Sequence, residues 1–136
     1  MARVLIVDDD WELRELLAQA LEDEGYDVLT LPDGSRVREV LAEQSEPCVT
    51  LLDLTMPCVS GWSVCHALEA EPALMARHPL IVMTAEHLPN GAVPAPAHAL
   101  LRKPFDLNTL YQLVAQAVSG AFANAGAQAN RPMIRR

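Results

Sequence analysis

Acidic side chains follow two short apolar runs of this chain. Asp8 and Asp9 come directly after the run Arg3 to Val7. Asp53 follows the run Cys48 to Leu52. Both runs have the length and aliphatic composition typical of strands buried in a parallel sheet. Because such sheets bind ligands in the crevice beyond the carboxyl ends of their strands, these acids are placed to meet a ligand.

The acid cluster suggests a particular chemistry. Three carboxylates brought together repel one another unless a cation compensates their charge, and hard oxygen ligands suit Mg²⁺. We therefore expect an Mg²⁺ site that contains Asp8, Asp9 and Asp53. A carboxylate beside Mg²⁺ can also attack phosphorus and form an aspartyl-phosphate.

Two further strand ends carry groups suited to a phosphoryl ligand. Thr84 follows the apolar run Leu80 to Met83, and Lys103 follows Ala99 to Arg102. An ammonium neutralises phosphoryl oxygens, and a hydroxyl can hydrogen-bond one of them. Lys103 is the only lysine among the 10 lysine and arginine residues of the chain. Because the two cations are not interchangeable, an isolated lysine at a strand end indicates a site.

Helical patterns separate the strands and predict the fold class. Apolar residues recur at spacings of three and four in four segments: Trp11 to Glu24, Ser35 to Gln44, Trp62 to Ala70 and the stretch after Asp106. Another strand is predicted over Tyr26 to Leu31. Strand and helix thus alternate about five times, which predicts an α/β fold with a parallel sheet and helices on both faces.

One segment breaks this alternation. Residues 89–96 read Pro-Asn-Gly-Ala-Val-Pro-Ala-Pro, where a helix would need apolar residues at three and four. Three prolines and a glycine disfavour a helix, so the fourth helix is expected to be weakened or missing. A less regular segment is also predicted between Pro72 and Pro79.

Length and charge limit the function classes. The 136 residues suit one domain, predicted over 1–119, with an Ala, Asn and Gly rich flexible tail over 120–136. The net charge of -8 argues against direct binding to nucleic acid or an anionic membrane surface. No apolar run reaches the roughly 18 residues that a membrane span needs, and the start of the chain reads as a strand rather than a signal peptide. A cytoplasmic protein is expected.

The remaining cysteine, histidine and tryptophan residues predict no second site. An odd number of cysteines without a Cys-x-x-Cys pair makes a disulfide framework improbable. The histidines share no spacing and are expected at the surface. Two tryptophans at helix starts are expected to pack on the core near the acids. These residues are Cys48, Cys58, Cys65, His66, His78, His87, His98, Trp11 and Trp62.

Together the motifs resemble the receiver domain of bacterial two-component response regulators, including single-domain chemotaxis-type regulators. The resemblance covers about residues 2–119. It is carried by Val4-Leu5-Ile6-Val7-Asp8-Asp9, Asp53-Leu54-Thr55-Met56-Pro57 with Gly61, Met83-Thr84-Ala85 and Lys103-Pro104-Phe105. It implies a flavodoxin-like, doubly wound, five-stranded parallel sheet in the order 2-1-3-4-5.

The resemblance also implies roles for the metal and phosphoryl residues. Asp53 resembles the phosphoacceptor of the family. Asp9 resembles the direct Mg²⁺ ligand, with Asp8 acting through water, and the Thr55 backbone carbonyl resembles a further ligand. The switch hydroxyl and the phosphate-pairing lysine correspond to Thr84 and Lys103.

The same resemblance implies partners rather than enzymatic turnover. A sensor histidine kinase or phosphotransfer protein donates the phosphoryl group, and an unidentified output protein reads the modified domain. The residues leave open whether the phosphorylated domain forms a homodimer.

Two departures keep alternatives open. Leu100 stands three places before Lys103, where the family usually has an aromatic residue, and the segment 86–98 is short and proline-rich. A degenerate receiver that binds partners without phosphorylation is one alternative. A small Mg²⁺-dependent phosphohydrolase is another, but Thr55 occupies the position two places after Asp53 where a second acid would be needed. Glu86 is expected either to overhang the phosphoryl site or to be an exposed loop acid.

Overall fold

A parallel sheet in the order β2-β1-β3-β4-β5 forms the centre of the molecule, in a computed structural model that describes residues 2–89 and 92–122. The predicted strand order is confirmed. β3 lies in the middle of the sheet and is buried along its whole length, which explains its unbroken apolar sequence. The strands are β1 (Arg3–Val7), β2 (Asp27–Leu31), β3 (Cys48–Asp53), β4 (Leu80–Thr84) and β5 (Ala99–Arg102).

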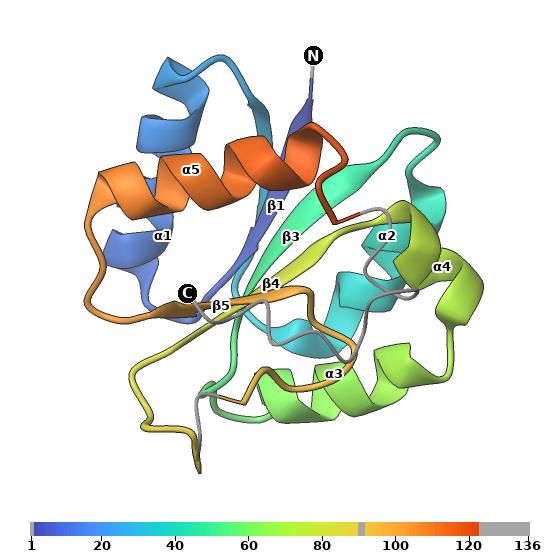
Figure 1. Cartoon of the computed structure of the whole chain (residues 1–136). Helices are drawn as coiled ribbons and strands as arrows, with labels where there is room; N and C mark the ends of the chain where they lie inside the picture. Colours follow the sequence, from blue (N-terminus) through green and yellow to red (C-terminus); the bar gives the residue numbers. More distant parts are fainter. Residues whose placement is uncertain (1, 90–91, 123–136) are drawn as a thin grey trace.

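Helices cover both faces of this sheet (Figure 1). One face packs against α1 (Trp11–Asp23) and α5 (Leu107–Val118). The other packs against α2 (Val37–Glu43), α3 (Gly61–Glu69) and α4 (Pro72–Arg77). Strand residues alternate between the two cores, as a two-residue period requires: Val4 and Ile6 contact the first, and Leu5 and Val7 the second.

The sequence signals mark the ends of the longest helices. The Asp10 side chain accepts a hydrogen bond from the Leu13 N–H at 3.2 Å, and Asp106 accepts from the Thr109 N–H at 2.8 Å. Gly25 follows α1 with φ 97°, the left-handed conformation that glycine adopts at low cost. These residues therefore fix the start of α1, the start of α5 and the end of α1.

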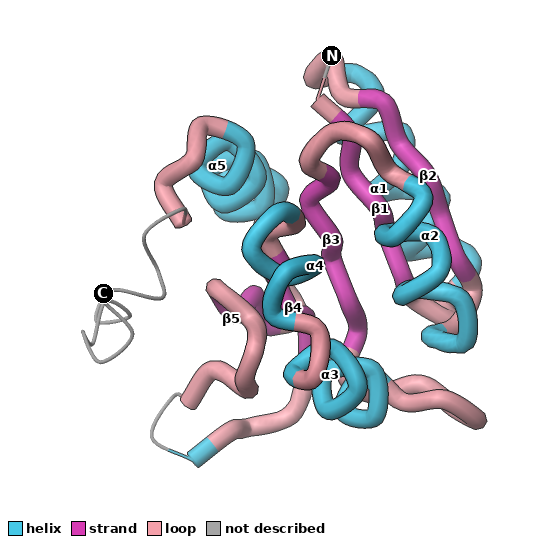
Figure 2. The backbone as a smooth tube through the Cα atoms, turned by 90° about the vertical axis from the view of Figure 1, so that its right-hand side faces the viewer, coloured by secondary structure: helices cyan, strands magenta, loops and turns pink. Residues whose placement is uncertain are grey.

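Two segments with several prolines were predicted to lack a regular helix, and the structure agrees for one of them only. Among the described residues no α-helix joins β4 to β5, and Figure 2 draws almost all of that connection as loop. This agrees with the prediction from the prolines. The irregular segment predicted after Pro72 is wrong, because it forms α4. Pro72 stands in the first turn, where a helix needs no N–H donor, and Met75 packs inward.

The predicted helix from Ser35 also starts differently, as a 3-10 turn, η1 (Gly34–Arg36), that leads into α2. Most of the predicted tail, residues 123–136, lies outside the described residues. Of its first residues, Phe122 packs against the core beneath α1 and α5. In the part of the chain that the structure describes, no helix has the length and apolar character to cross a membrane.

Candidate functional site

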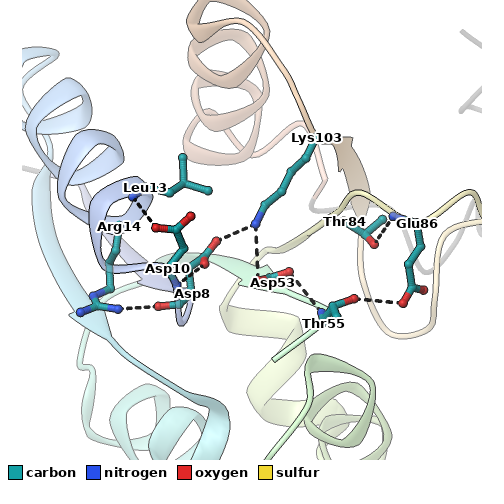
Figure 3. A network of polar contacts seen from close by, with 9 residues as sticks. All are labelled: Asp8, Asp10, Leu13, Arg14, Asp53, Thr55, Thr84, Glu86 and Lys103. Carbon is teal, nitrogen blue, oxygen red and sulfur yellow. Dashed lines mark hydrogen bonds and ion pairs between the residues drawn. The ribbon is translucent and has the colours of Figure 1, made fainter. Parts of the chain in front are cut away.

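Strand register brings the predicted site residues to one edge of the sheet. Val7 of β1 pairs with Leu52 of β3, so Asp8 and Asp53 are the next residues of neighbouring strands. Figure 3 shows these side chains and Lys103, which follows β5, pointing toward one another. The residues come from separate parts of the sequence and converge because parallel strands end on the same side.

Asp8 is the most constrained acid of the site. Its side chain is completely buried. One carboxylate oxygen, Oδ1, accepts from the Asp10 N–H at 2.9 Å, and Oδ2 accepts from the Lys103 ammonium at 2.9 Å. The Arg14 guanidinium donates to the Asp8 backbone carbonyl at 2.7 Å (Figure 3). Sequence analysis missed Arg14, because its spacing resembles that of any surface arginine on an amphipathic helix.

Asp53 lies deep at the end of β3 with 4% of its surface exposed. Its Oδ1 accepts from the Thr55 N–H at 3.1 Å, and its Oδ2 lies 3.4 Å from the Lys103 Nζ. Burial raises the pKa of Asp53, the Asp8 charge raises it further, and Lys103 offsets part of this effect. The Asp53 carboxylate therefore lacks full charge compensation from the protein.

Lys103 holds the two buried acids together. Burial by itself would lower its pKa, but the hydrogen bond and charge of Asp8, together with Asp53, hold the pKa of Lys103 above its usual value. The side chain thus stays an ammonium at neutral pH. It is positioned to pair with any further anion bound at Asp53.

The acids form a group that fits a divalent cation. Carboxylate oxygens of Asp8, Asp9 and Asp53 all lie within 4.8 Å of one another. Asp9 is exposed, so its carboxylate reaches solvent, whereas the other two are buried. Hard oxygen donors, one of them open to water, suit Mg²⁺, which keeps several of its waters. The raised pKa of Asp53 also indicates that positive charge is needed here.

Glu86 connects the two loops beside Asp53. The Thr55 hydroxyl donates to Glu86 Oε2 at 3.0 Å, and the Glu86 N–H donates to the Thr84 hydroxyl oxygen at 2.9 Å (Figure 3). Thr84 is completely buried, whereas Glu86 and Thr55 are exposed. Of the two positions considered for Glu86, the structure therefore shows an exposed loop acid that also reaches the mouth of the site.

Gly61 shapes the loop after Asp53. A Cβ atom added at Gly61 would overlap the backbone of Asp53 and Leu54, and the Gly61 N–H donates to the Leu54 carbonyl at 3.0 Å. The loop therefore doubles back against the end of β3. Only glycine allows this close approach, so the residue helps to fix the backbone that carries Asp53.

Two aromatic residues near the site differ from expectation. Trp11 is 63% exposed and Trp62 is 42% exposed, so the prediction that they pack on the core is wrong. Each stands in the first turn of its helix and faces solvent there. Leu100, in contrast, is partly buried against the core beneath α2, α3 and α4.

The sequence of the chain is similar to those of bacterial response regulators. The model of the response regulator receiver domain matches residues 4–115. The DNA-binding response regulator MtrA of Mycolicibacterium smegmatis is 37% identical over 84 residues, which are 62% of this chain and 35% of MtrA. The chain thus spans about a third of the length of this curated relative.

Solved structures agree with this likeness. Chemotaxis protein CheY4 of Vibrio cholerae is 30% identical, with a TM-score of 0.70 over 86% of this chain and 98% of that one. The response regulator TrrA of Thermotoga maritima, crystallised with Mg²⁺-BeF, is 26% identical, with a TM-score of 0.73 over 86% of this chain and 99% of that one.

Proposed function

The chain belongs to the response regulator receiver domain family, and from this premise we propose that Asp53 accepts a phosphoryl group from a histidine kinase or phosphotransfer protein in the presence of Mg²⁺. One observation supports this proposal most directly. Asp8, Asp9, Asp53 and Lys103 converge at one edge of the sheet, and the acids lie close enough to share a cation. The family is a class of signalling domains, so we propose a switch rather than an enzyme with turnover on a substrate.

The transfer exchanges one bond at phosphorus for another. A carboxylate oxygen of Asp53 attacks the phosphorus of a phosphohistidine, the O–P bond forms and the N–P bond breaks. Lys103 pairs with a phosphoryl oxygen, since its ammonium already lies 3.4 Å from Asp53 Oδ2. Asp8, Asp9, Asp53 and the Thr55 carbonyl would hold Mg²⁺. When bound, Mg²⁺ supplies positive charge that offsets the acids and the phosphoryl oxygens.

Thr84 links the modification to a change in shape. Its hydroxyl oxygen accepts from the Glu86 N–H, and a hydroxyl can at the same time donate to a phosphoryl oxygen. Phosphorylation would thus favour one arrangement of Thr84 and of the loop that follows it. With Leu100 in place of an aromatic residue, this loop and the proline-rich connection to β5 would carry the signal.

The proposed output is a protein contact in the cytoplasm. The relative MtrA is described as DNA-binding, but this chain aligns with only 35% of it and carries a net charge of -8, which disfavours direct binding to nucleic acid or to an anionic membrane. We therefore propose an output protein as the partner. Size-exclusion chromatography with and without phosphodonor tests the further arrangement, a phosphorylation-dependent homodimer.

An intact-mass experiment tests the phosphoacceptor role. The purified chain is incubated with acetyl phosphate, with Mg²⁺ or with EDTA, and Asp53→Asn serves as the control. We expect a phosphoryl adduct that needs Mg²⁺ and is absent in Asp53→Asn. A folded chain that binds Mg²⁺ but forms no adduct would contradict the proposal.

A second function would then remain: an interaction module that works without phosphorylation. The partly buried Leu100 and the lack of an α-helix among the described residues between β4 and β5 favour this candidate. It predicts that partner binding is the same for the native chain and for Asp53→Asn. The phosphohydrolase alternative predicts instead multiple turnover on a small phosphate ester, measured as release of inorganic phosphate.

A further inference from the structure

A buried histidine lies at the opposite end of the sheet from the acids. His78 is completely buried, so the expectation that the histidines lie at the surface is wrong for this residue. Its Nδ1 accepts a hydrogen bond from the Cys48 N–H, the first residue of β3, at 3.0 Å. Because Nδ1 accepts, the ring proton of the neutral imidazole is on Nε2. Among the described residues, Nε2 has no hydrogen-bond partner.

A second histidine repeats this arrangement on the next strand. His98 Nδ1 accepts from the Leu80 N–H, the first residue of β4, at 3.0 Å. The backbone N–H of His98 donates to the Leu80 backbone carbonyl at 2.7 Å. The imidazole also stacks on Phe122, with ring centroids 5.8 Å apart and an interplanar angle of 11°. His98 is therefore held by two hydrogen bonds and one ring contact.

The two histidines connect three neighbouring strands. His78 precedes β4 and holds the first N–H of β3, whereas His98 precedes β5 and holds the first N–H of β4. β3 and β4 carry Asp53 and Thr84 at their far ends, and Lys103 follows β5. We call the pair His78 and His98 the histidine lock.

The lock can work only while both rings are neutral. A proton on Nδ1 turns the acceptor into a donor that faces another donor, and leaves the strand N–H without its partner. A buried N–H that loses its hydrogen bond destabilises the folded state. The hydrogen bonds of the lock are thus incompatible with the imidazolium form.

The surroundings of both rings also disfavour a positive charge. Burial lowers the pKa of His78, and the Arg77 charge lowers it further, while the nearby Leu41 carbonyl offsets part of the effect. From β3, the titratable neighbour is Cys48, whose thiol stays neutral because burial raises its pKa to about 11. Burial also lowers the pKa of His98, which faces the Leu80 backbone and the Phe122 ring.

We propose that the histidine lock is sensitive to acid. In mild acid, β4 and β5, and with them Thr84 and Lys103, lose their stable hydrogen-bonded structure before the rest of the sheet. The unfolded chain binds a proton at each histidine below the ordinary pKa of about 6.5, whereas the folded chain does not. The stability from the lock is therefore present above about pH 6.5 and is lost as the pH falls below it.

Nuclear magnetic resonance of the isotope-labelled chain tests the lock without any substitution. We expect His78 and His98 to remain neutral, with the proton on Nε2, at a pH about one unit below the ordinary histidine pKa of about 6.5. We also expect the amides of Cys48, β4 and β5 to lose hydrogen-exchange protection at a higher pH than those of β1 and β2. Protonation of both lock histidines at the ordinary histidine pKa of about 6.5, or an even loss of protection across the sheet, would overturn the proposal.

Substitution with asparagine provides the second test, since its side-chain oxygen can accept in the place of Nδ1 without binding a proton. Urea unfolding measures the unfolding constant of the native chain. For each of the two lock histidines, this constant should rise by up to about tenfold for every pH unit below 6.5, because only the unfolded chain binds the proton. His98→Asn should remove one such tenfold factor, and His66→Asn, at an exposed position, is the control for the substitution itself. An equal pH dependence in His98→Asn and the native chain would contradict the lock.

His78→Asn extends this test to the buried position. If that variant does not fold, the resonance titration of the native chain and the His98→Asn comparison still decide the question.

Discussion

The two ends of the sheet respond to pH in opposite directions. At the carboxyl ends, burial and the Asp8 charge raise the pKa of Asp53, so its contribution to stability is present at low pH and is lost as the pH rises through that pKa. At the amino ends, burial lowers the pKa of His78 and His98, so their contribution is lost as the pH falls. One end therefore needs a cation, and the other must stay free of charge.

This difference separates a site that can respond to ligands from a scaffold that must not change. The acid end has two buried carboxylates beside one ammonium, an imbalance that a metal ion can correct. The amino end satisfies its strand N–H groups with uncharged rings.

Removal of the Lys103 ammonium from between the two buried acids should have the largest effect of the substitutions considered. If Asp53 is the phosphoacceptor, as proposed, Lys103→Ala would leave its phosphoryl group without an ammonium partner, so we expect the rate of adduct formation with acetyl phosphate to fall by about 100-fold or more. Intact mass as a function of time measures this rate. Arg102→Ala is the matched control, since it removes the same charge from the adjacent exposed position. A comparable loss in both variants would show that only the general charge matters.

Gly61→Ala should destabilise the acid end by steric overlap. Because the new Cβ would meet the backbone of Asp53 and Leu54, we expect a loss of about 2–4 kcal/mol in the free energy of unfolding, measured with urea. Gly25→Ala is the comparison, since Gly25 has positive φ but open space around it, and a loss of about 1 kcal/mol is expected there. Equal losses would contradict the close approach.

Mg²⁺ should stabilise the acid end by binding the folded state alone. At ten times its dissociation constant, the expected gain is about 1.4 kcal/mol in the free energy of unfolding at pH 7.5. The gain should shrink as the pH falls, because a raised pKa makes Asp53 bind protons at a higher pH than an ordinary aspartate. Urea unfolding with KCl of equal ionic strength is the control. A gain of similar size in Asp9→Asn would argue against the predicted ligand set.

Glu86→Gln should have the smallest effect. The Glu86 carboxylate reaches the mouth of the site through Thr55 and would repel the phosphoryl charge of the adduct. Its removal is expected to lengthen the lifetime of the adduct by about threefold, a modest factor because the residue is exposed and its charge is screened. Decay of the adduct after removal of phosphodonor measures this lifetime, with Glu69→Gln as the control. A shorter lifetime would contradict the repulsion.

The sequence patterns predicted the parallel sheet and the residues at the strand ends, and the resemblance to receiver domains implied the strand order. Runs such as Cys48 to Leu52 are long and apolar enough to indicate buried strands, and parallel strands end on one side. The sequence alone therefore predicted that the acids and Lys103 lie close together at one edge of the sheet. The helix after Pro72 was missed because proline usually ends a helix, although it is compatible with the first turn.

What the sequence by itself determined is therefore the set of elements and the types of groups at the acid edge, since these follow from local periodicity and strand direction. Tertiary structure alone decided that Arg14 holds the Asp8 carbonyl, that Glu86 reaches Thr55 and that His78 is buried against Cys48. Each of these contacts except the one of Arg14 joins residues about 30 positions apart. Burial and protonation depend on such distant neighbours, because the field and the hydrogen bonds around a side chain come from whatever the fold packs against it.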